Sequence, residues 1–259
     1  MVLIVLKTAL QLYTVRNLPN GPETHFACAA EAGYTGVELL GDHGLESEAM
    51  SELLEKYGLE PTSSHVALDE LESNTDRVVG FHREIGTKLL VVPFLPVELR
   101  GNDTASWQMI GRRLGLLGKT CREAGLNLGY HNHDFEMVSV GGATGLDIIL
   151  SAAASEDLFL ELDIAWAVRG NRDPLELLDR YRGRCPRVHV KDLNPDRPEE
   201  QGWADVGDGI LDWDILLPAT VEAGTEWLVV EHDSPLDPVR TANRSQAFLV
   251  SKGFGQNLI

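Results

Sequence analysis

Residues 107–131 decide the fold: an amphipathic helical pattern ends at Gly125, and the run Leu126-Asn-Leu-Gly-Tyr-His131 follows it directly. Glycine at this position is typical of a helix C-terminus, because it adopts the left-handed conformation without steric cost. The run after it is short and apolar and is bounded by the glycine, which predicts a buried strand. This segment therefore predicts a helix followed by a strand, the repeating unit of a parallel α/β protein.

The same order of helix, glycine and strand recurs along the 259 residues, with junction glycines at positions 33, 58, 86, 125 and 224. The predicted strands are 9–12, 36–40, 61–66, 89–93, 126–131, 158–163, 187–190 and 227–231. The clearest helical patterns are 23–32, 48–57, 107–124 and a segment that begins at Asp173-Pro174. Strands begin roughly every 30 residues, the length of one strand-plus-helix unit. Eight units in about 250 residues predict a single (β/α)8 TIM barrel.

An open doubly wound sheet is the alternative α/β architecture. Such a sheet usually carries a Gly-rich phosphate loop after its first strand, whereas Leu12-Tyr-Thr-Val-Arg16 follows here. No linker-like tract divides residues 1–259, so we expect one domain. The apolar start Met1-Val-Leu-Ile-Val-Leu6 is interrupted by Lys7, which favours a first strand or its lead-in over a signal peptide.

Charge excludes several functions. The chain has 22 Lys and Arg against 40 Asp and Glu, a formal charge of −18. Such an acidic surface repels phosphate backbones and anionic lipids, so we expect no nucleic-acid or membrane partner. Three cysteines without metal-type spacing (Cys28, Cys121 and Cys185) make a disulfide framework improbable and indicate a cytoplasmic protein.

Polar residues follow the apolar strands at their carboxyl ends, where barrel enzymes carry their active sites. They are Gln11, Glu38, His65, His131, His133, Glu136, Asp163, His189, Lys191 and Glu231. Each has an ordinary structural interpretation; Asp163, for example, can simply cap a loop. Together, however, His, Asp and Glu at several neighbouring strand ends favour a site for one divalent ion such as Mn²⁺, Co²⁺, Zn²⁺ or Mg²⁺.

These residues resemble the xylose-isomerase-like TIM barrels, the sugar phosphate isomerase/epimerase group. The motifs that carry the resemblance are Leu10-Gln-Leu-Tyr-Thr-Val-Arg16, Gly33-Tyr-Thr-Gly-Val-Glu38, Ser64-His65, Gly129-Tyr-His-Asn-His-Asp-Phe-Glu136, Asp163-Ile-Ala-Trp166, Val188-His-Val-Lys-Asp192, Val206-Gly-Asp-Gly209 and Glu231. Their order and spacing span nearly the whole chain. The His-x-His variant is similar to inosose-dehydratase-like and keto-glycoside-processing members.

The resemblance implies one divalent metal held by residues of the last four strands. Asp163, His189 and Glu231 match three of the family's ligands. The fifth strand departs from the pattern, because His131 stands where relatives such as the ketose epimerases place a glutamate. The fourth ligand is then either Glu136, which we favour because a carboxylate neutralises the metal better, or His131.

The resemblance also implies chemistry on a sugar with a carbonyl beside a hydroxyl. Our main hypothesis is an isomerase or epimerase working through an enediolate, and the alternative is a lyase acting on a keto-sugar, keto-glycoside or inosose. Glu231 and a histidine, His131 or His133, would exchange the proton, since an imidazole suits a general base at neutral pH. Lys191 or His65 would hold substrate oxygens. Gln11, Glu38, His65 and Trp166 are the predicted substrate-binding residues.

The segment after the seventh strand carries Asp192, Asp196, Glu199, Glu200, Asp205 and Asp208. Phosphate-binding barrels usually hold the phosphate near this segment, so the acidic residues predict an unphosphorylated substrate. An AP-endonuclease-like nuclease shares the fold, but the −18 charge opposes it. A non-catalytic binding protein is opposed by the intact set of Asp163, His189 and Glu231. Relatives often form homo-oligomers, which stays an expectation here.

Overall fold

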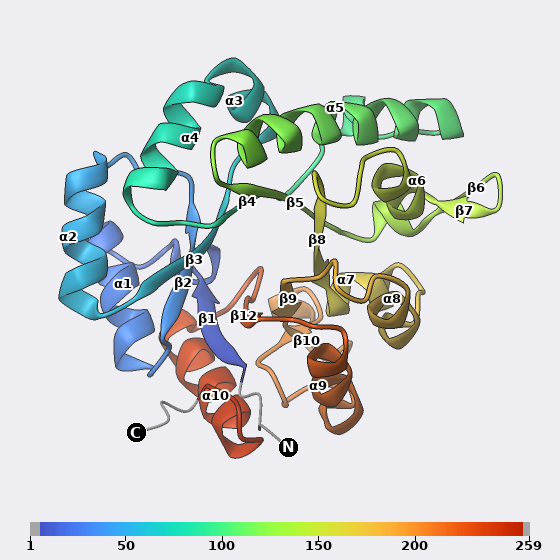
Figure 1. The fold of residues 1–259 in the computed structure, drawn as a ribbon. Coiled ribbons are helices and arrows are strands. Elements are labelled where there is room, and N and C mark those ends of the chain that lie inside the picture. Colours follow the sequence, from blue (N-terminus) through green and yellow to red (C-terminus); the bar gives the residue numbers. More distant parts are fainter. Residues whose placement is uncertain (1–5, 256–259) are drawn as a thin grey trace.

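The computed structural model describes residues 6–255 and contains a closed barrel of parallel strands in the order β1-β12-β9-β8-β5-β4-β3-β2 (Figure 1). The barrel strands are β1 (Lys7–Gln11), β2 (Gly36–Leu40), β3 (Glu60–His65), β4 (Leu89–Val92), β5 (Asn127–His131), β8 (Phe159–Asp163), β9 (Arg187–Val190) and β12 (Trp227–Val230). The predicted (β/α)8 barrel is confirmed. The interpretation of Met1–Leu6 as a strand or lead-in falls largely outside the described residues, and β1 begins at Lys7.

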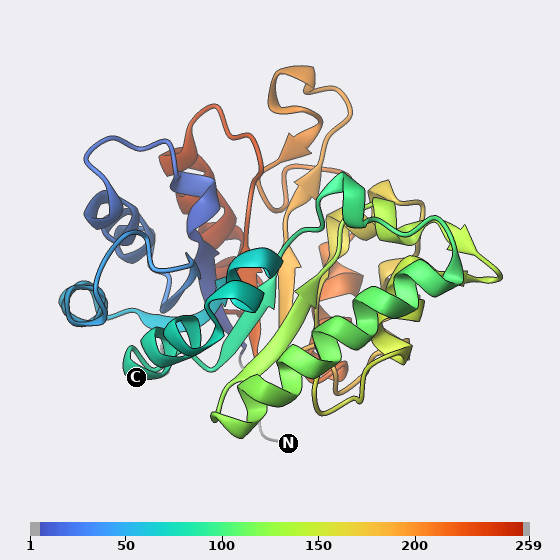
Figure 2. The same ribbon diagram turned by 90° about the horizontal axis from the view of Figure 1, so that it is seen from above.

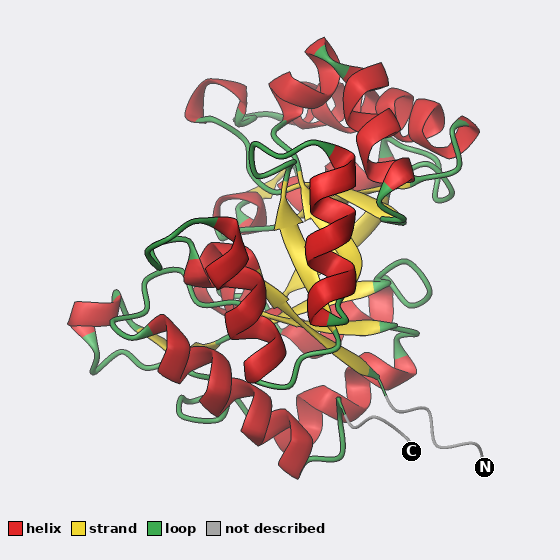
Figure 3. Cartoon of the chain, turned by 90° about the vertical axis from the view of Figure 1, so that its left-hand side faces the viewer, coloured by secondary structure: helices red, strands yellow, loops and turns green. Residues whose placement is uncertain are grey.

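Helices surround the strands on the outside of the barrel (Figure 3). They are α1 (Pro22–Glu31), α2 (Ser47–Tyr57), α3 (Leu68–Ser73), α4 (Thr75–Glu84), α5 (Thr104–Glu123), α6 (Gly145–Ser151), α7 (Ile164–Arg169), α8 (Pro174–Arg180), α9 (Trp213–Glu222) and α10 (Pro238–Ser251). In residues 6–255, no helix combines the length and the apolar character that crossing a membrane requires.

Local signals explain where the helices begin and end. The five predicted junction glycines have φ between 62° and 90°, the conformation that ends a helix and that other residues adopt only with strain. At the other end, the side chain of Asp103 accepts a hydrogen bond from Ser106 N and caps α5, and Asp173 caps α8 in the same way through Leu175 N. The capping side chains and the glycines thus determine where these helices begin and end.

The alternation of side chains along each strand separates two environments. Outward residues such as Leu10, Leu162 and Val188 join the main hydrophobic core between the barrel and the helices. Inside the barrel, Ala9, Trp227 and Val229 form a small separate apolar cluster. The next inward residues toward the carboxyl ends are polar, so the upper half of the barrel interior is available for chemistry.

Two short hairpins extend this end of the barrel. One pairs β6 (Ser139–Val140) with β7 (Ala143–Thr144), and the other pairs β10 (Asp192–Leu193) with β11 (Trp203–Ala204). Figure 2 shows the β10–β11 segment, in orange, projecting beyond the carboxyl end of β9. The 3₁₀ turns η1 (Leu12–Val15), η2 (Val97–Leu99), η3 (Phe135–Met137) and η4 (Pro198–Glu200) lie in loops that follow β1, β4, β5 and β9. The three cysteines are buried free thiols.

Candidate metal centre and active site

Four side chains from neighbouring strands converge inside the barrel at its carboxyl end. His131 ends β5, Asp163 ends β8, His189 lies on β9 and Glu231 directly follows β12. One ligand atom from each lies within 4.8 Å of all the others, and all four residues are buried. Two imidazoles and two carboxylates form a donor set that suits a divalent transition metal, so the residues present fit such an ion.

Asp163 is held in place by both its backbone and its carboxylate. Its N–H donates to Asn132 Oδ1 at 2.9 Å, and Asn132 Nδ2 donates back to the Asp163 carbonyl at 3.2 Å. Its Oδ1 accepts from Trp166 N at 2.8 Å and caps α7. The other oxygen, Oδ2, lies 3.7 Å from His131 Nε2 and 3.9 Å from His189 Nδ1. Asp163 is therefore a helix cap and a member of the cluster at once.

A buried lysine neutralises the carboxylates of this cluster. Lys191 Nζ lies 2.9 Å from Asp163 Oδ2, 2.5 Å from Glu231 Oε2 and 2.9 Å from Asp233 Oδ2. Burial lowers the pKa of Lys191, but these three carboxylates outweigh burial and raise that pKa well above its ordinary value. Lys191 is thus a fixed positive charge beside the cluster.

A second layer of charged side chains lies beneath the cluster. Glu38 Oε1 lies 2.7 Å from His189 Nε2 and 3.0 Å from His65 Nε2. Glu161 Oε2 lies 2.8 Å from His65 Nε2 and 3.1 Å from His131 Nδ1. Burial lowers the pKa of His65, but Glu38 and Glu161 outweigh it and raise that pKa to about 10. His131 and His189 of the cluster therefore each have one ring nitrogen in contact with a buried carboxylate.

Glu161, Asn132 and Asp233 are functional candidates that the strand-end pattern does not indicate. Glu161 precedes Asp163 by two residues on one strand, so both side chains face the barrel interior. This spacing in Leu158-Phe-Leu-Glu-Leu-Asp163 was the signal that could have found Glu161.

The structure places Glu136 apart from the cluster. It lies in η3, where Oε2 accepts from His133 N at 2.8 Å and Oε1 contacts the Tyr130 hydroxyl. Burial raises its pKa to about 7. Among residues 6–255, the groups with converging ligand atoms include His131 but not Glu136. In this structure, Glu136 holds the loop that carries His133.

A cavity of about 420 Å³ opens above the cluster. It is lined by Tyr13, Leu40, His65, Pro93, Phe94, His131, His133, Glu231 and Asp233. Lysine and arginine are absent from this lining within the described residues. Phe94 packs edge-on against His133, with ring centroids 5.3 Å apart. The cavity thus combines an aromatic wall with histidine and carboxylate groups.

His133 lines the cavity and has one ring nitrogen, Nδ1, that is buried without a hydrogen-bond partner in the described part of the chain. Burial and the charge of Lys191 lower the pKa of His133 to about 3, so its imidazole is neutral at physiological pH. Trp166 packs beside it with ring centroids 4.8 Å apart.

Two other predicted substrate-binding residues lie deeper than the cavity wall. Gln11 and Glu38 are fully buried, and Gln11 Nε2 donates to Glu38 Oε1 at 2.5 Å. Ser63 Oγ donates to the other Glu38 oxygen at 2.6 Å. Their role in substrate binding stays a prediction, since their partners in this structure are protein side chains. His65, by contrast, lies on the wall of the cavity.

Several acidic side chains in the segment after β9 are paired with arginines, which the sequence alone did not indicate. Asp205 lies 3.3 Å from Arg240 Nη2 and 3.8 Å from Arg244 Nε, and Asp208 lies 2.7 Å from Arg244 Nη2. Glu200 pairs with Arg197 at 3.0 Å. These pairs weaken the net repulsion that the segment exerts, so its sequence charge alone does not decide the substrate's charge.

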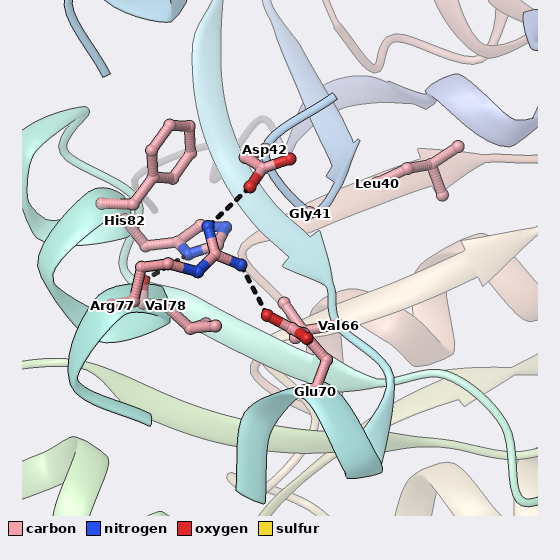
Figure 4. A pocket seen from close by; sticks show the side chains of 9 residues that line it. Leu40, Gly41, Asp42, Val66, Glu70, Arg77, Val78 and His82 are labelled. Carbon is pink, nitrogen blue, oxygen red and sulfur yellow. Dashed lines mark hydrogen bonds and ion pairs between the residues drawn. The ribbon is translucent and has the colours of Figure 1, made fainter. Parts of the chain in front are cut away.

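A smaller cavity of about 230 Å³ lies between the loops after β2 and β3 and shares Leu40 with the first. Figure 4 shows Arg77 clamped between Asp42 Oδ2 and Glu70, at 2.7 Å and 2.5 Å. His82 lies behind the clamp, with Nδ1 at 2.7 Å from the Val78 carbonyl. The charged groups of this smaller cavity, Arg77, Asp42 and Glu70, are paired with each other.

Several known proteins are similar to this chain over most of its length. An inosose dehydratase of Lacticaseibacillus casei is 23% identical over an alignment of 257 positions that includes 86% of this chain and 85% of that protein. A sugar phosphate isomerase/epimerase of Parabacteroides distasonis has a similar structure, with a TM-score of 0.81, 22% identity and coverage of 97% and 96%.

The 3-keto-D-glucoside 4-epimerase of E. coli also superposes on the chain, with a TM-score of 0.72, 18% identity and coverage of 95% and 99%. The family described as the xylose isomerase-like TIM barrel matches residues 26–252. That match spans most of the barrel, including every strand that contributes to the cluster. The chain therefore belongs to the xylose isomerase-like TIM barrel family.

Proposed function

We propose that this protein is a divalent-metal-dependent lyase that dehydrates an unphosphorylated keto-sugar or inosose. The observation that carries the proposal is the convergence of His131, Asp163, His189 and Glu231, two of which reach the wall of the 420 Å³ cavity. The similarity to a protein named inosose dehydratase supports the substrate class.

His131, Asp163, His189 and Glu231 would hold the metal. We take His131 rather than Glu136 as the fourth ligand, because both Glu136 oxygens are already engaged within its own loop. A divalent ion bound there supplies a Lewis acid that polarises substrate oxygens.

The chain's own residues account for the proton transfers. His133 lines the cavity as a neutral imidazole and would accept the proton from the carbon beside the carbonyl. His65 shares that wall, is hydrogen-bonded to Glu161 and donates a proton to the departing hydroxyl. Lys191 holds the Glu231 carboxylate in place, with Nζ 2.5 Å from Oε2. One base and one acid on the same cavity are what a dehydration needs.

Two observations support an uncharged substrate. Within the described residues, the cavity wall carries carboxylates and neutral or histidine side chains rather than lysine or arginine. The helices that follow the seventh and eighth barrel strands are capped by their own carboxylates, Asp212 for α9 and Asp237 for α10. A substrate phosphate would have to displace those carboxylates from the helix N-termini.

Epimerisation of a keto-sugar is the second candidate. It is favoured by the presence of a second basic group, Glu231, among the residues that line the cavity with His133. Two bases allow a proton to leave one face of a carbon and return to the other.

One experiment separates these reactions. The purified protein is stripped with a chelator, reloaded with Mn²⁺, Co²⁺, Zn²⁺ or Mg²⁺, and incubated in D₂O with inososes and 3-keto-glycosides. We expect products that have lost water, detected by mass spectrometry. A product that keeps its oxygens and gains solvent deuterium supports the epimerase instead. Turnover that survives chelation, or absence of turnover on every substrate, contradicts the proposal.

A further inference from the structure

Beneath the proposed metal ligands, the carboxylate of Glu161 joins three imidazoles. Its Oε2 lies 2.8 Å from His65 Nε2, 3.1 Å from His131 Nδ1 and 3.2 Å from His189 Nε2. Glu161 is fully buried, and its register partner across the β5–β8 ladder is His131. A buried carboxylate in contact with this many ring nitrogens is a hydrogen-bond acceptor for them.

Each of the two proposed ligand histidines has one ring nitrogen near a carboxylate of the proposed metal site and the other near a buried glutamate. His131 directs Nε2 toward Asp163, at 3.7 Å, and Nδ1 toward Glu161, at 3.1 Å. His189 is reversed: Nδ1 lies 3.1 Å from Glu231, and Nε2 lies 2.7 Å from Glu38. On each ring, the nitrogen that we call upper faces a carboxylate of the proposed metal site, Asp163 or Glu231. The nitrogen that we call lower faces the buried carboxylate of Glu161 or Glu38.

This arrangement fixes where the imidazole protons must sit for metal binding. A neutral imidazole has one N–H and one lone pair, and only the nitrogen with the lone pair can bind a metal. A carboxylate accepts hydrogen bonds but donates none while ionised. A lower nitrogen that keeps its proton for Glu161 or Glu38 therefore leaves the upper nitrogen free for the ion.

We propose that Glu161 is a positioning residue that holds the Nδ1 proton of His131 so that Nε2 is offered to the metal. Glu38 has the same relation to His189, which then binds through Nδ1. The two ligand histidines therefore bind through different ring nitrogens. The inference rests on the proposed function only for the presence of the ion.

The surroundings of Glu38 support a fixed orientation. Gln11 and Ser63 donate to its two oxygens at 2.5 Å and 2.6 Å. The Glu38 carboxylate therefore cannot rotate away from His189 Nε2 without losing these bonds. Partners of metal-ligating histidines commonly orient the ring in this way, and their loss typically lowers metal affinity about 10–100-fold.

The test uses ¹⁵N-histidine-labelled protein and long-range ¹H–¹⁵N NMR spectra, which distinguish the two tautomers. In metal-free wild type, His131 should carry its proton on Nδ1. In the Zn²⁺-loaded protein, His131 should bind through Nε2 and His189 through Nδ1. Glu161→Gln should weaken Zn²⁺ binding about 10–100-fold in a competition assay and shift His131 toward the other tautomer.

Glu200→Gln is the matched control, because Glu200 is another buried, ion-paired glutamate but lies in the segment after β9. It should leave Zn²⁺ affinity unchanged. The inference is overturned if metal-free His131 carries its proton on Nε2, or if Glu161→Gln, folded as judged by its circular dichroism, binds Zn²⁺ as tightly as wild type. Tight Zn²⁺ binding with the expected tautomers but no turnover of keto-sugars would refute the proposed function and leave this inference standing.

Discussion

Asp163 and Asp192 are two fully buried aspartates near the ends of the adjacent strands β8 and β9, and their surroundings differ in kind. Asp192 accepts from Trp213 Nε1 at 2.7 Å and from the backbone N–H groups of Leu193, Gly207 and Leu211 at 2.8, 3.0 and 3.1 Å. Within the described residues, only one Asp163 oxygen, Oδ1, accepts a backbone hydrogen bond. The other, Oδ2, lies near the His131 ring and the Lys191 ammonium.

The strand alternation produces this difference. Lys191 continues the inward face of β9, and the next residue, Asp192, faces away from the barrel interior into the β10–β11 segment. A buried carboxylate that is saturated by neutral donors stabilises a loop. A buried carboxylate with one oxygen among ionisable groups is a candidate for chemistry. The following changes test that distinction.

The largest effect is expected for Asp163→Asn. The amide still caps α7 through Oδ1 but supplies a poorer ligand, so we expect kcat/KM to fall on the order of 10³-fold. Metal content should fall with it, and the melting temperature should fall as well, because the amide takes one of three carboxylate partners from the buried Lys191 ammonium. Full activity with normal metal content would remove Asp163 from the site.

Asp192→Ala should lower the stability of the fold and leave metal binding unchanged. It leaves the Trp213 indole and three backbone N–H groups without their acceptor, at a cost of about 3 kcal/mol in the free energy of unfolding. Urea denaturation measures this cost. Zn²⁺ affinity of the folded variant should remain at the wild-type value, and a selective loss of metal binding would contradict the division between the two aspartates.

His133→Gln tests the cavity wall rather than the ligand set. Removal of a general base typically costs 10²–10⁴-fold, and we expect about 10²-fold in kcat. Because His133 does not bind the ion in our proposal, metal affinity should be unchanged. Loss of the metal together with activity would make His133 a ligand instead.

The smallest effect concerns a third aspartate, which is partly exposed. Burial raises the pKa of Asp147, but hydrogen bonds from the Tyr181 hydroxyl, Thr144 and Arg180 outweigh burial and lower that pKa from 3.8 to about 2. A carboxyl group with a lowered folded-state pKa stabilises the fold above its unfolded pKa and loses this contribution as the pH falls toward 2. Asp147→Asn should therefore cost about 1 kcal/mol at pH 6 and much less at pH 2, measured by chemical denaturation at both pH values.

The sequence predicted the barrel well, because each strand is a short apolar run with a marked end. The predicted strand 158–163 became β8 (Phe159–Asp163), and 227–231 became β12 (Trp227–Val230). The two-residue strands of the β6–β7 and β10–β11 hairpins escaped prediction, since two residues carry no periodicity.

The site was predictable in part. Strand ends identified Asp163 and His189, but the depth of each residue inside a barrel depends on the stagger between strands. The register that sets His131 beside Glu161 joins residues thirty positions apart, and no local pattern shows it. The compensation of Asp205 by Arg240 and Arg244 is hidden for the same reason.

The paired hydrogen bonds between Asn132 and Asp163 have a mechanical consequence. An amide side chain here imitates a backbone peptide, with an acceptor for the Asp163 N–H and a donor for its carbonyl. It adds one rung to the β5–β8 ladder just beyond the last backbone pair, His131 with Glu161. The spacing between the two strands that carry His131 and Asp163 is thus set by the chain itself. A divalent ion of the proposed site would therefore meet two ligands whose backbone positions are already fixed by hydrogen bonds within the protein.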